Sequence, residues 1–218
     1  KTLLERQVYQ FRQIGISNIS IVRGFMGHQI EIPGITYFDN IEYSNTNMLV
    51  SLFEAKSIMD GDTIVSYADI MFSQKMLEKL ICEEADIAVS VDVLWKKYWL
   101  MRYGIIEYDI ESLMLNSKNM IVSIGKDVSS IENIDGRFVG LTKFTLNGLQ
   151  MMTSIWEKYI SLYWDKPWQV SGRPMRQAYM TDMLQALIDH NFLVRASINS
   201  NGWVEFDTDT DYENALSW

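Results

Sequence analysis

Short apolar runs, joined to one another by segments with helical spacing, restrict the fold of this chain most strongly. Such runs occupy residues 18–24, 62–69 and 86–93, and helical patterns occupy 46–59 and 73–84 between them. Strands that are apolar nearly throughout are buried on both faces, and helices that alternate with them form the crossovers of a parallel sheet. The first half of the chain therefore predicts an α/β fold with helices on both faces of the sheet.

The second half of the chain changes rhythm. Strands with short connections, and then two helices, are expected at 111–115, 120–126, 137–144, 146–160 and 180–190. No internal repeat or low-complexity tract divides the sequence. We therefore expect one domain over residues 1–218, with a Rossmann-like three-layer α/β/α architecture and a central mixed, mostly parallel sheet.

Composition argues against several classes of function. The net charge of −9 argues against a nucleic-acid partner, because phosphate binding requires clustered Lys and Arg. No stretch approaches the ~20 uninterrupted apolar residues that span a bilayer, so no membrane insertion is expected. The single cysteine, Cys82, permits no intrachain disulfide and favours a reducing, cytoplasmic location. The two histidines, His28 and His190, stand in separate turn-like segments, which argues against nucleophilic Ser/His or Cys/His chemistry.

Acidic side chains stand at the ends of two predicted strands. Asp69 ends the run IVSYAD, and Glu205 and Asp207 share one face of the strand-like run GWVEFD. Ligand sites of open α/β sheets lie beyond the carboxyl ends of the strands, so Asp69 and Asp207 could share a divalent cation. Mg²⁺ suits such a site, because it binds one or two protein carboxylates together with water and phosphate oxygens. The alternative is that both carboxylates are ordinary helix caps.

Several segments follow one another as in a known family. They are KTLLERQ, YSNTNMLVSLFEAK, SYADIMF, VDVLWKKYWLMR with YDIES, SIGKD, GRFVGLTKF, YMTDMLQALID and GWVEFDT. Their order resembles that of the sugar-nucleotide-type nucleotidyltransferases, specifically the small cytidylyltransferases that act on phosphocholine, aminoethylphosphonate and related acceptors. The resemblance runs from Lys1 to about Asp211. Of the family's glycine-rich signature loop only Lys1 is present, so we expect the rest to precede Lys1 in the full protein; the connection after Gly104 is also shorter than usual.

The resemblance implies Mg²⁺-dependent transfer of CMP from CTP to a small phosphate or phosphonate acceptor, with release of pyrophosphate. Asp69 and Asp207 would hold the metal, Lys1 would reach the triphosphate, and Lys126 would lie beside the α-phosphate or the acceptor. The nucleotide-binding residues would be Asn45, Thr46, Asn47, Ser66 and Ala68. Without the resemblance, Lys126 is a solvated hairpin lysine, and one of the three residues at the start of the predicted helix, Asn45 to Asn47, is an N-cap.

The acceptor pocket is predicted from a helical stripe and the short acidic segment that follows it. Its residues are Asp92, Trp95, Trp99, Arg102, Asp109 and Glu111. Aromatic rings with carboxylates suit a cationic amine, and Arg102 could hold a phosphate, a phosphonate or a carboxylate. Phosphocholine, aminoethylphosphonate and a phosphorylated amino acid all remain open. A tryptophan stripe at helical spacing is also typical of a hydrophobic core.

Three other functions compete with this interpretation. One is a nucleotidyltransferase that makes a nucleotide sugar from UTP or another nucleotide. Another is a catalytically silent relative that binds a nucleotide or a partner, which Asp69, Asp207 and Lys1 disfavour because all three are present. The third is a glycosyltransferase, since DTDTD at 207–211 imitates an Asp-x-Asp motif, although it lies at the wrong end of the chain. An oligomer is compatible with the sequence.

Overall fold

A computed structural model describes residues 1–128 and 130–216 of the 218-residue chain. Its largest sheet has the strand order β3 (Thr63–Ser66), β8 (Arg137–Phe144), β5 (Ile87–Asp92) and β9 (Arg195–Asn199). β5 pairs with β9 in parallel, whereas β8 runs antiparallel to both of its neighbours. β8 is therefore the reversed strand of an otherwise parallel sheet, which confirms the predicted mixed, mostly parallel α/β arrangement.

Three two-stranded sheets surround this centre. β1 (Ser20–Arg23) pairs in parallel with β2 (Thr36–Asp39). β4 (Ile70–Phe72) pairs antiparallel with β10 (Trp203–Glu205). β6 (Glu111–Leu115) pairs antiparallel with β7 (Ile121–Asp127).

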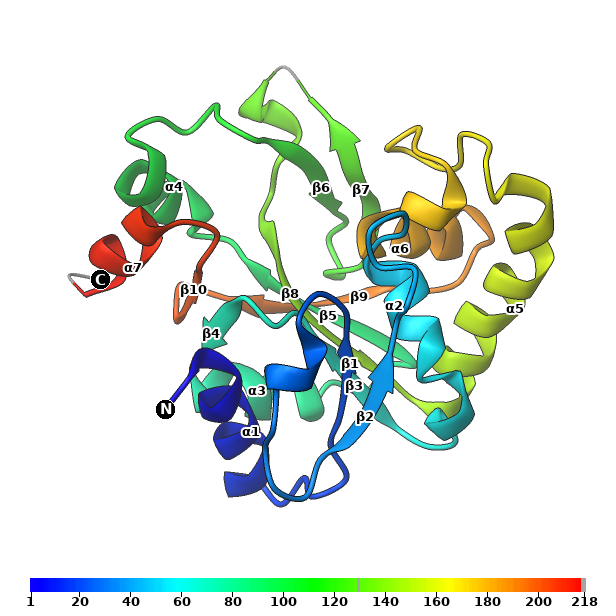
Figure 1. The fold of residues 1–218 in the computed structure, drawn as a ribbon. Helices are drawn as coiled ribbons and strands as arrows, with labels where there is room; N and C mark the ends of the chain where they lie inside the picture. The colour runs from blue at the N-terminus through cyan, green and yellow to red at the C-terminus, as the bar shows by residue number, and fades with distance from the viewer. Residues whose placement is uncertain (129, 217–218) are drawn as a thin grey trace.

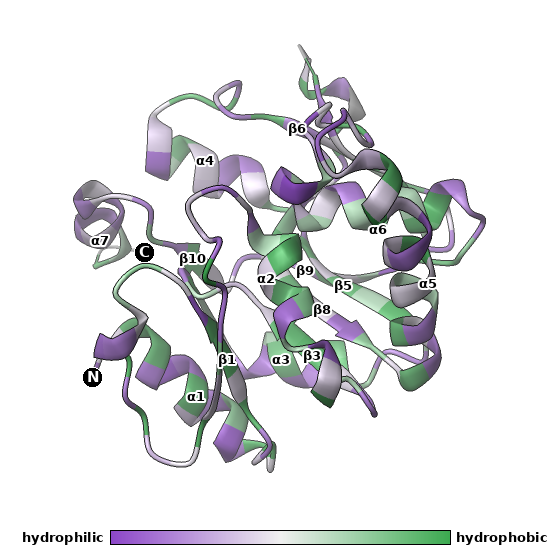
Figure 2. Cartoon of the chain, turned by 45° about the vertical axis from the view of Figure 1, so that its right-hand side comes forward, coloured by the Kyte–Doolittle hydropathy of each residue, from purple (hydrophilic) through white to green (hydrophobic). Residues whose placement is uncertain are grey.

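Helices cover both faces of the sheet and give the three layers that the sequence predicts. One core forms where α2 (Met48–Glu54), α5 (Leu146–Tyr163) and α6 (Met180–Asp189) pack on one face. A second core forms where α1 (Leu3–Gln13), α3 (Gln74–Ile81) and α4 (Trp95–Tyr103) pack on the other. Figure 1 shows α5 and α1 at opposite sides of the molecule. In Figure 2 the covering helices α1 and α5 alternate hydrophobic and hydrophilic stretches, as amphipathic helices do.

The remaining elements are short. They are the 3₁₀ helices η1 (Gly27–Gln29), η2 (Lys56–Ile58), η3 (Ile131–Asn133) and η4 (Met175–Gln177), and the last α-helix, α7 (Asp209–Ala215). Within residues 1–128 and 130–216, every helix is too short or too polar to cross a bilayer.

Local sequence signals place the elements that carry the site. Ser73 caps α3, since its Oγ accepts a hydrogen bond from the backbone N of Met76 at 3.3 Å. Asn47 caps α2 through Oδ1, which accepts from the N of Met48 at 2.7 Å. Gly140 has a φ of +83°, and a Cβ there would lie 2.8 Å from the ring of Tyr67. This glycine therefore lets Tyr67 pack against β8 at the carboxyl end of β3.

Candidate active site

The turn between β3 and β4 carries Asp69 toward the edge where β10 joins the fold. Gln7 of α1 is buried and donates from Nε2 to the carbonyls of Tyr67 (2.9 Å) and Ile70 (2.5 Å), which fixes the backbone on both sides of Asp69. β10 pairs with β4 so that Glu205 stands opposite Ile70, and the N of Phe206 donates to the carbonyl of Asp69 at 2.8 Å. The chain therefore brings Asp207 next to Asp69.

Three carboxylates meet at this point. Asp69, Glu205 and Asp207 each offer one oxygen, and these oxygens all lie within 4.8 Å of one another. We call these three residues the acidic cluster. The sequence prediction paired Asp69 with Asp207, and the structure brings them together and adds Glu205. The alternative that both are helix caps is wrong, because Thr208 caps α7 and Ser73 caps α3.

The acidic cluster fits a hard divalent cation. Asp69 Oδ1 is buried and has no hydrogen-bond partner among the described residues. Burial raises the pKa of Asp69, and the neighbouring Asp207 raises it further. Burial also raises the pKa of Glu205, against the attraction of Arg102. An unpartnered carboxylate oxygen among like charges is what a bound cation relieves, and oxygen ligands are those that Mg²⁺ prefers.

Arg102 binds two carboxylates of the acidic cluster, Glu205 and Asp207, together with Asp211. Its guanidinium binds Asp211 through Nε (2.6 Å) and Nη2 (3.0 Å), Asp207 through Nη2 (2.6 Å), and Glu205 through Nη1. The Arg102 side chain is only 2 % exposed. Burial lowers the pKa of Arg102, but its three carboxylate partners outweigh this and raise it overall. The expectation that Arg102 faces the acceptor thus differs from the structure, because protein carboxylates use its donors.

The tryptophan stripe of α4 also lies elsewhere than predicted. Trp95 and Trp99 are each 1 % exposed and belong to the core under α4. Asp92 is fully buried, and its carboxylate accepts hydrogen bonds from the N of Leu94 and the Nε1 of Trp203. Trp95 and Trp99 therefore pack in the core, which is the alternative that helical spacing left open, and hydrogen bonds within the protein occupy the Asp92 carboxylate.

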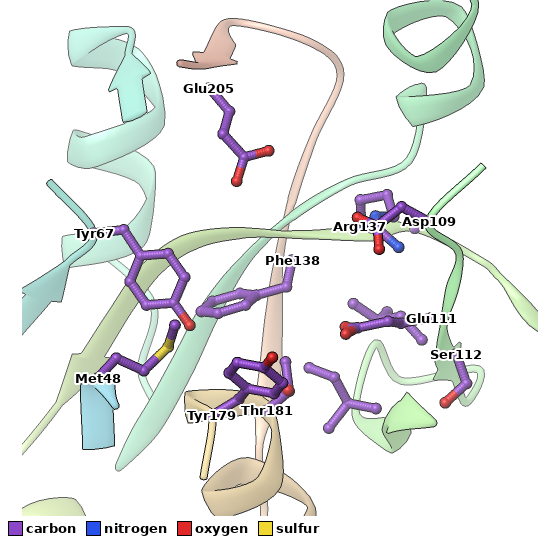
Figure 3. A pocket seen from close by; sticks show the side chains of 13 residues that line it. Met48, Tyr67, Asp109, Glu111, Ser112, Arg137, Phe138, Tyr179, Thr181 and Glu205 are labelled. Atoms are coloured by element: carbon purple, nitrogen blue, oxygen red, sulfur yellow. Dashed lines mark ion pairs between the residues drawn. The ribbon is translucent and has the colours of Figure 1, made fainter. Parts of the chain in front are cut away.

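A pocket of about 250 Å³ opens beside the acidic cluster and contains the other two predicted acceptor residues. Asp109 and Glu111 line it, and Glu205 belongs both to this pocket and to the acidic cluster. Figure 3 shows Tyr67 and Met48 on one side, with Arg137, Asp109 and Glu111 on the other. The remaining lining residues are Ser112, Leu113, Ile124, Gly136, Phe138, Tyr179 and Thr181.

Arg137 is a pocket residue that the sequence reasoning missed. Its side chain is 12 % exposed, and its guanidinium carbon lies 4.3 Å from the centre of the Trp99 ring. Burial lowers the pKa of Arg137 and raises that of Glu111, while each group's charge opposes the shift of the other. The signal was an arginine opening the otherwise apolar strand RFVGL, which could have been read as a charge held inside the fold.

The residues predicted for the nucleotide lie outside the pocket lining. The backbone carbonyl of Asn45 accepts from Arg176 at 2.6 Å, and Thr46 Oγ1 accepts from Asn40 at 2.9 Å. Asn47 precedes the pocket residue Met48, as the cap of α2. The segment therefore adjoins the pocket lining through Met48.

The remaining predicted site residues are Ser66 and Ala68, near the end of β3, and the two lysines, Lys1 and Lys126. Ser66 donates from Oγ to the carbonyl of Tyr67 at 3.0 Å, and Ala68 directly precedes Asp69. Lys1 is exposed, with Nζ 4.5 Å from the centre of the Tyr9 ring. Lys126 is exposed on β7, and its backbone N donates to the Oγ of Ser112 at 3.1 Å. Neither lysine lines the pocket.

Comparison with known proteins shows that the chain is similar to nucleotidyltransferases. No family profile matches the chain. The CTP:phosphoglutamine cytidylyltransferase of Campylobacter jejuni subsp. jejuni serotype O:2 is 28 % identical over 224 residues, which cover 98 % of this chain and 86 % of that protein.

Solved structures share the fold at lower identity. The CTP:phosphocholine cytidylyltransferase of Streptococcus pneumoniae has a TM-score of 0.70 at 19 % identity, covering 100 % of this chain and 85 % of that one. The inositol-1-phosphate CTP transferase of T. maritima has a TM-score of 0.68 at 16 % identity, covering 98 % and 81 %. A putative glucose-1-phosphate thymidylyltransferase of Bacillus anthracis has a TM-score of 0.70 at 14 % identity, covering 99 % and 82 %. Fold and full-length similarity together confirm the resemblance of this chain to the small cytidylyltransferase branch of the sugar-nucleotide-type nucleotidyltransferases, and with it the prediction of a nucleotidyltransferase enzyme.

Proposed function

We propose that this protein transfers CMP from CTP to a small phosphate or phosphonate acceptor in a Mg²⁺-dependent reaction that releases pyrophosphate. The observation that carries the proposal is the acidic cluster of Asp69, Glu205 and Asp207, which adjoins the pocket through Glu205. The names of the similar proteins support CTP, because three of the four name it. The acceptors in those three names are phosphoglutamine, inositol 1-phosphate and phosphocholine, which share a phosphate.

The reaction requires two anions to meet. An oxygen of the acceptor forms a bond to the α-phosphorus of CTP, and the bond from that phosphorus to the bridging oxygen breaks, so that pyrophosphate leaves. Positioning and charge stabilisation supply most of the rate in such transfers. Mg²⁺ held by Asp69, Glu205 and Asp207 would neutralise charge on the phosphate oxygens.

The chain's own residues orient these groups. Arg102 keeps Glu205 and Asp207 directed toward Asp69, because its guanidinium donates to both carboxylates. Lys1 and Lys126 would add positive charge to the triphosphate and the acceptor, as the family resemblance implies. The segment from Asn45 to Asn47 would contact the base, with Ser66 and Ala68 at the neighbouring strand end. Side-chain amides can read a cytosine edge that both donates and accepts hydrogen bonds.

The pocket supports an acceptor with a cationic nitrogen. Asp109 and Glu111 line it, and a cation would offset their charge. A hexose 1-phosphate offers Asp109 and Glu111 only neutral hydroxyl donors, so these two carboxylates favour an acceptor with a cationic nitrogen over a sugar phosphate. The fold alone does not disfavour it, since the thymidylyltransferase-like structure has a TM-score of 0.70.

One experiment tests the proposed function directly. The full-length protein is incubated with each of the four nucleoside triphosphates, Mg²⁺ and a panel of phosphate and phosphonate acceptors, and pyrophosphate release is followed. We expect release with CTP and an amine-bearing acceptor, and none after EDTA is added. Release with glucose 1-phosphate alone would assign the protein to the nucleotide-sugar enzymes, and no release with any pair would favour a silent relative.

A further inference from the structure

Two opposite charges line the pocket and have no hydrogen-bond partners among residues 1–128 and 130–216. In the part of the chain that the structure describes, the Arg137 guanidinium makes no hydrogen bond, and its one ion pair is a 3.9 Å approach of Nη2 to Asp109 Oδ2. The Glu111 carboxylate, partly buried on β6, likewise has no hydrogen-bond partner among the described residues. Figure 3 shows Arg137, Asp109 and Glu111 on one side of the pocket.

Arg102, another largely buried arginine near the site, differs from Arg137 in its hydrogen bonds. Arg102, at 2 % exposure, has hydrogen bonds from its Nε and both Nη atoms to carboxylates. Arg137, at 12 % exposure, instead lies against the face of Trp99, and its guanidinium has no hydrogen-bond acceptor in the described part of the chain. The unpartnered polar atoms of Arg137 and Glu111 are not fully buried, and both side chains line the pocket. A ligand in the pocket can therefore reach them and supply hydrogen-bond partners.

The acceptors under consideration differ in what they supply. Phosphocholine and aminoethylphosphonate carry one cation and one phosphorus anion. The acidic cluster would hold the reacting end beside the cation, so the amine would satisfy Glu111 and Asp109 and leave Arg137 unpaired. An α-amino acid head group carries an ammonium and a carboxylate on one carbon, which matches a guanidinium and a carboxylate that share one wall of a small pocket.

We propose that the acceptor is a phosphorylated amino acid whose α-carboxylate binds Arg137 and whose α-ammonium binds Glu111 and Asp109. This inference rests on the proposed cytidylyl transfer and names the class of its acceptor. Arg137 is then the residue that distinguishes an amino acid from a plain amine. Stacking on Trp99 restricts where its guanidinium can lie, which favours a planar, bidentate contact with a carboxylate.

Matched acceptors that differ by one charged group test this inference. O-phosphoserine differs from phosphoethanolamine by its carboxylate alone, and from 3-phosphoglycerate by an ammonium in place of a hydroxyl. O-phosphohomoserine and 3-aminopropyl phosphate form a longer pair that also differs only in the carboxylate. In whichever pair the wild type uses better, we expect kcat/KM with CTP to be about tenfold to a hundredfold higher for the amino acid than for its matched amine. The reason is that the amine lacks the carboxylate and leaves the partly buried Arg137 without its partner.

Variants assign the preference to a residue. In Arg137→Gln the ratio between amino acid and amine should fall toward one, whereas in Glu111→Gln the preference over 3-phosphoglycerate should fall instead. Lys118→Gln, which removes one positive charge from an exposed turn, is the control and should keep both ratios. If Arg137→Gln loses its cooperative thermal transition, Arg137→Lys replaces it, and a single ammonium should still weaken the preference.

Direct binding separates failure of this inference from failure of the proposed function. Each compound is titrated calorimetrically into the wild type with a non-hydrolysable CTP analogue and Mg²⁺, and again without them. Tighter binding of the amino acid without any turnover would support the pocket assignment and reject the transfer reaction. Turnover with CTP in which phosphoethanolamine and 3-aminopropyl phosphate match or exceed the amino acids would overturn the inference while leaving the proposed function intact.

Discussion

Asp69 and Asp207 lie side by side because β10 pairs antiparallel with β4, and the register sets Glu205 opposite Ile70. The Phe206 backbone N, which lies between the two acidic residues of this strand end, donates to the carbonyl of Asp69. Two segments distant in the sequence thus share one backbone ladder. Asp69 directly precedes β4 and Asp207 closely follows β10, so both carboxylates flank this ladder, which favours a preorganised cation site.

Removing either aspartate should abolish Mg²⁺-dependent turnover. Asp69→Asn and Asp207→Asn each delete a charge from the acidic cluster, and loss of one electrostatic contact to a transition state typically lowers the rate by ~10²- to 10³-fold. Rates at limiting Mg²⁺ and the affinity for Mn²⁺ both measure the effect. The matched control is Asp209→Asn, an exposed carboxylate in the first turn of α7, which should retain activity. Near wild-type rates in either cluster variant would reject the shared-metal arrangement.

Asp69→Asn should make the metal-free protein more stable. The pKa of Asp69 is raised by burial and by Asp207, so the folded state holds this proton more tightly than the unfolded state does. The stability that this group contributes is therefore present at low pH and is lost as pH rises through the raised folded pKa. At neutral pH the variant should melt at a higher temperature than wild type in EDTA. Addition of Mg²⁺ should raise the melting temperature of the wild type only, and an equal rise in both proteins would contradict a role for Asp69 in cation binding.

CTP should be the preferred nucleotide. The segment YSNTNMLVSLFEAK resembles that of the cytidylyltransferases, and its residues Asn45, Thr46 and Asn47 lie at the start of α2, beside the pocket. Values of kcat/KM for CTP, UTP, ATP and GTP with one acceptor measure the preference. Equal use of UTP would move the protein to the nucleotide-sugar enzymes.

Arg102 should contribute more to stability than any exposed ion pair. Its side chain is 2 % exposed and joins Glu205, Asp207 and Asp211, so Arg102→Gln would leave those carboxylates without their common cation. Breaking a buried pair in this way typically costs about 3–5 kcal/mol of unfolding free energy. Chemical denaturation measures it, with Lys56→Gln as the control, because the Lys56–Glu157 pair is exposed on both sides. Comparable losses in the two variants would show that Arg102 is not a structural brace.

The Arg102–Asp211 pair should give stability a defined pH dependence. Burial alone would raise the pKa of Asp211, but hydrogen bonds from Arg102 and Thr208 lower it to about 2, from 3.8. Because its pKa is lower in the folded than in the unfolded state, Asp211 stabilises the fold fully at pH values above its unfolded pKa. This stabilisation is lost as the pH falls toward the folded pKa of about 2. Asp211→Asn should therefore be less stable than wild type by about 2 kcal/mol at pH 6, and by about half of that at pH 3. A difference in stability between wild type and Asp211→Asn that is equal at pH 6 and pH 3 would refute this origin of the pH dependence.

The sequence by itself determined the secondary structure and its caps. Alternation of apolar runs with helical spacing predicted the α/β layers, and Ser73 and Asn47 cap the helices that begin at the next residue, α3 and α2. These features are decided within a few neighbouring residues, by periodicity and by side-chain hydrogen bonds to the first turn. The same local pattern placed Asp69 and Asp207 near strand ends, and in the structure Asp69 lies in the turn between β3 and β4 and Asp207 just after β10.

Only the tertiary structure decided which side of each element faces the site. Helical spacing put Trp95, Trp99 and Arg102 on one face of α4, but the docking of α4 onto the sheet turned that face into the core and directed Arg102 to the acidic cluster. Reversal of β8 likewise brought Arg137 to the pocket wall. A sequence period fixes which residues share a face. What that face meets depends on partners distant in the chain, and no local pattern encodes them.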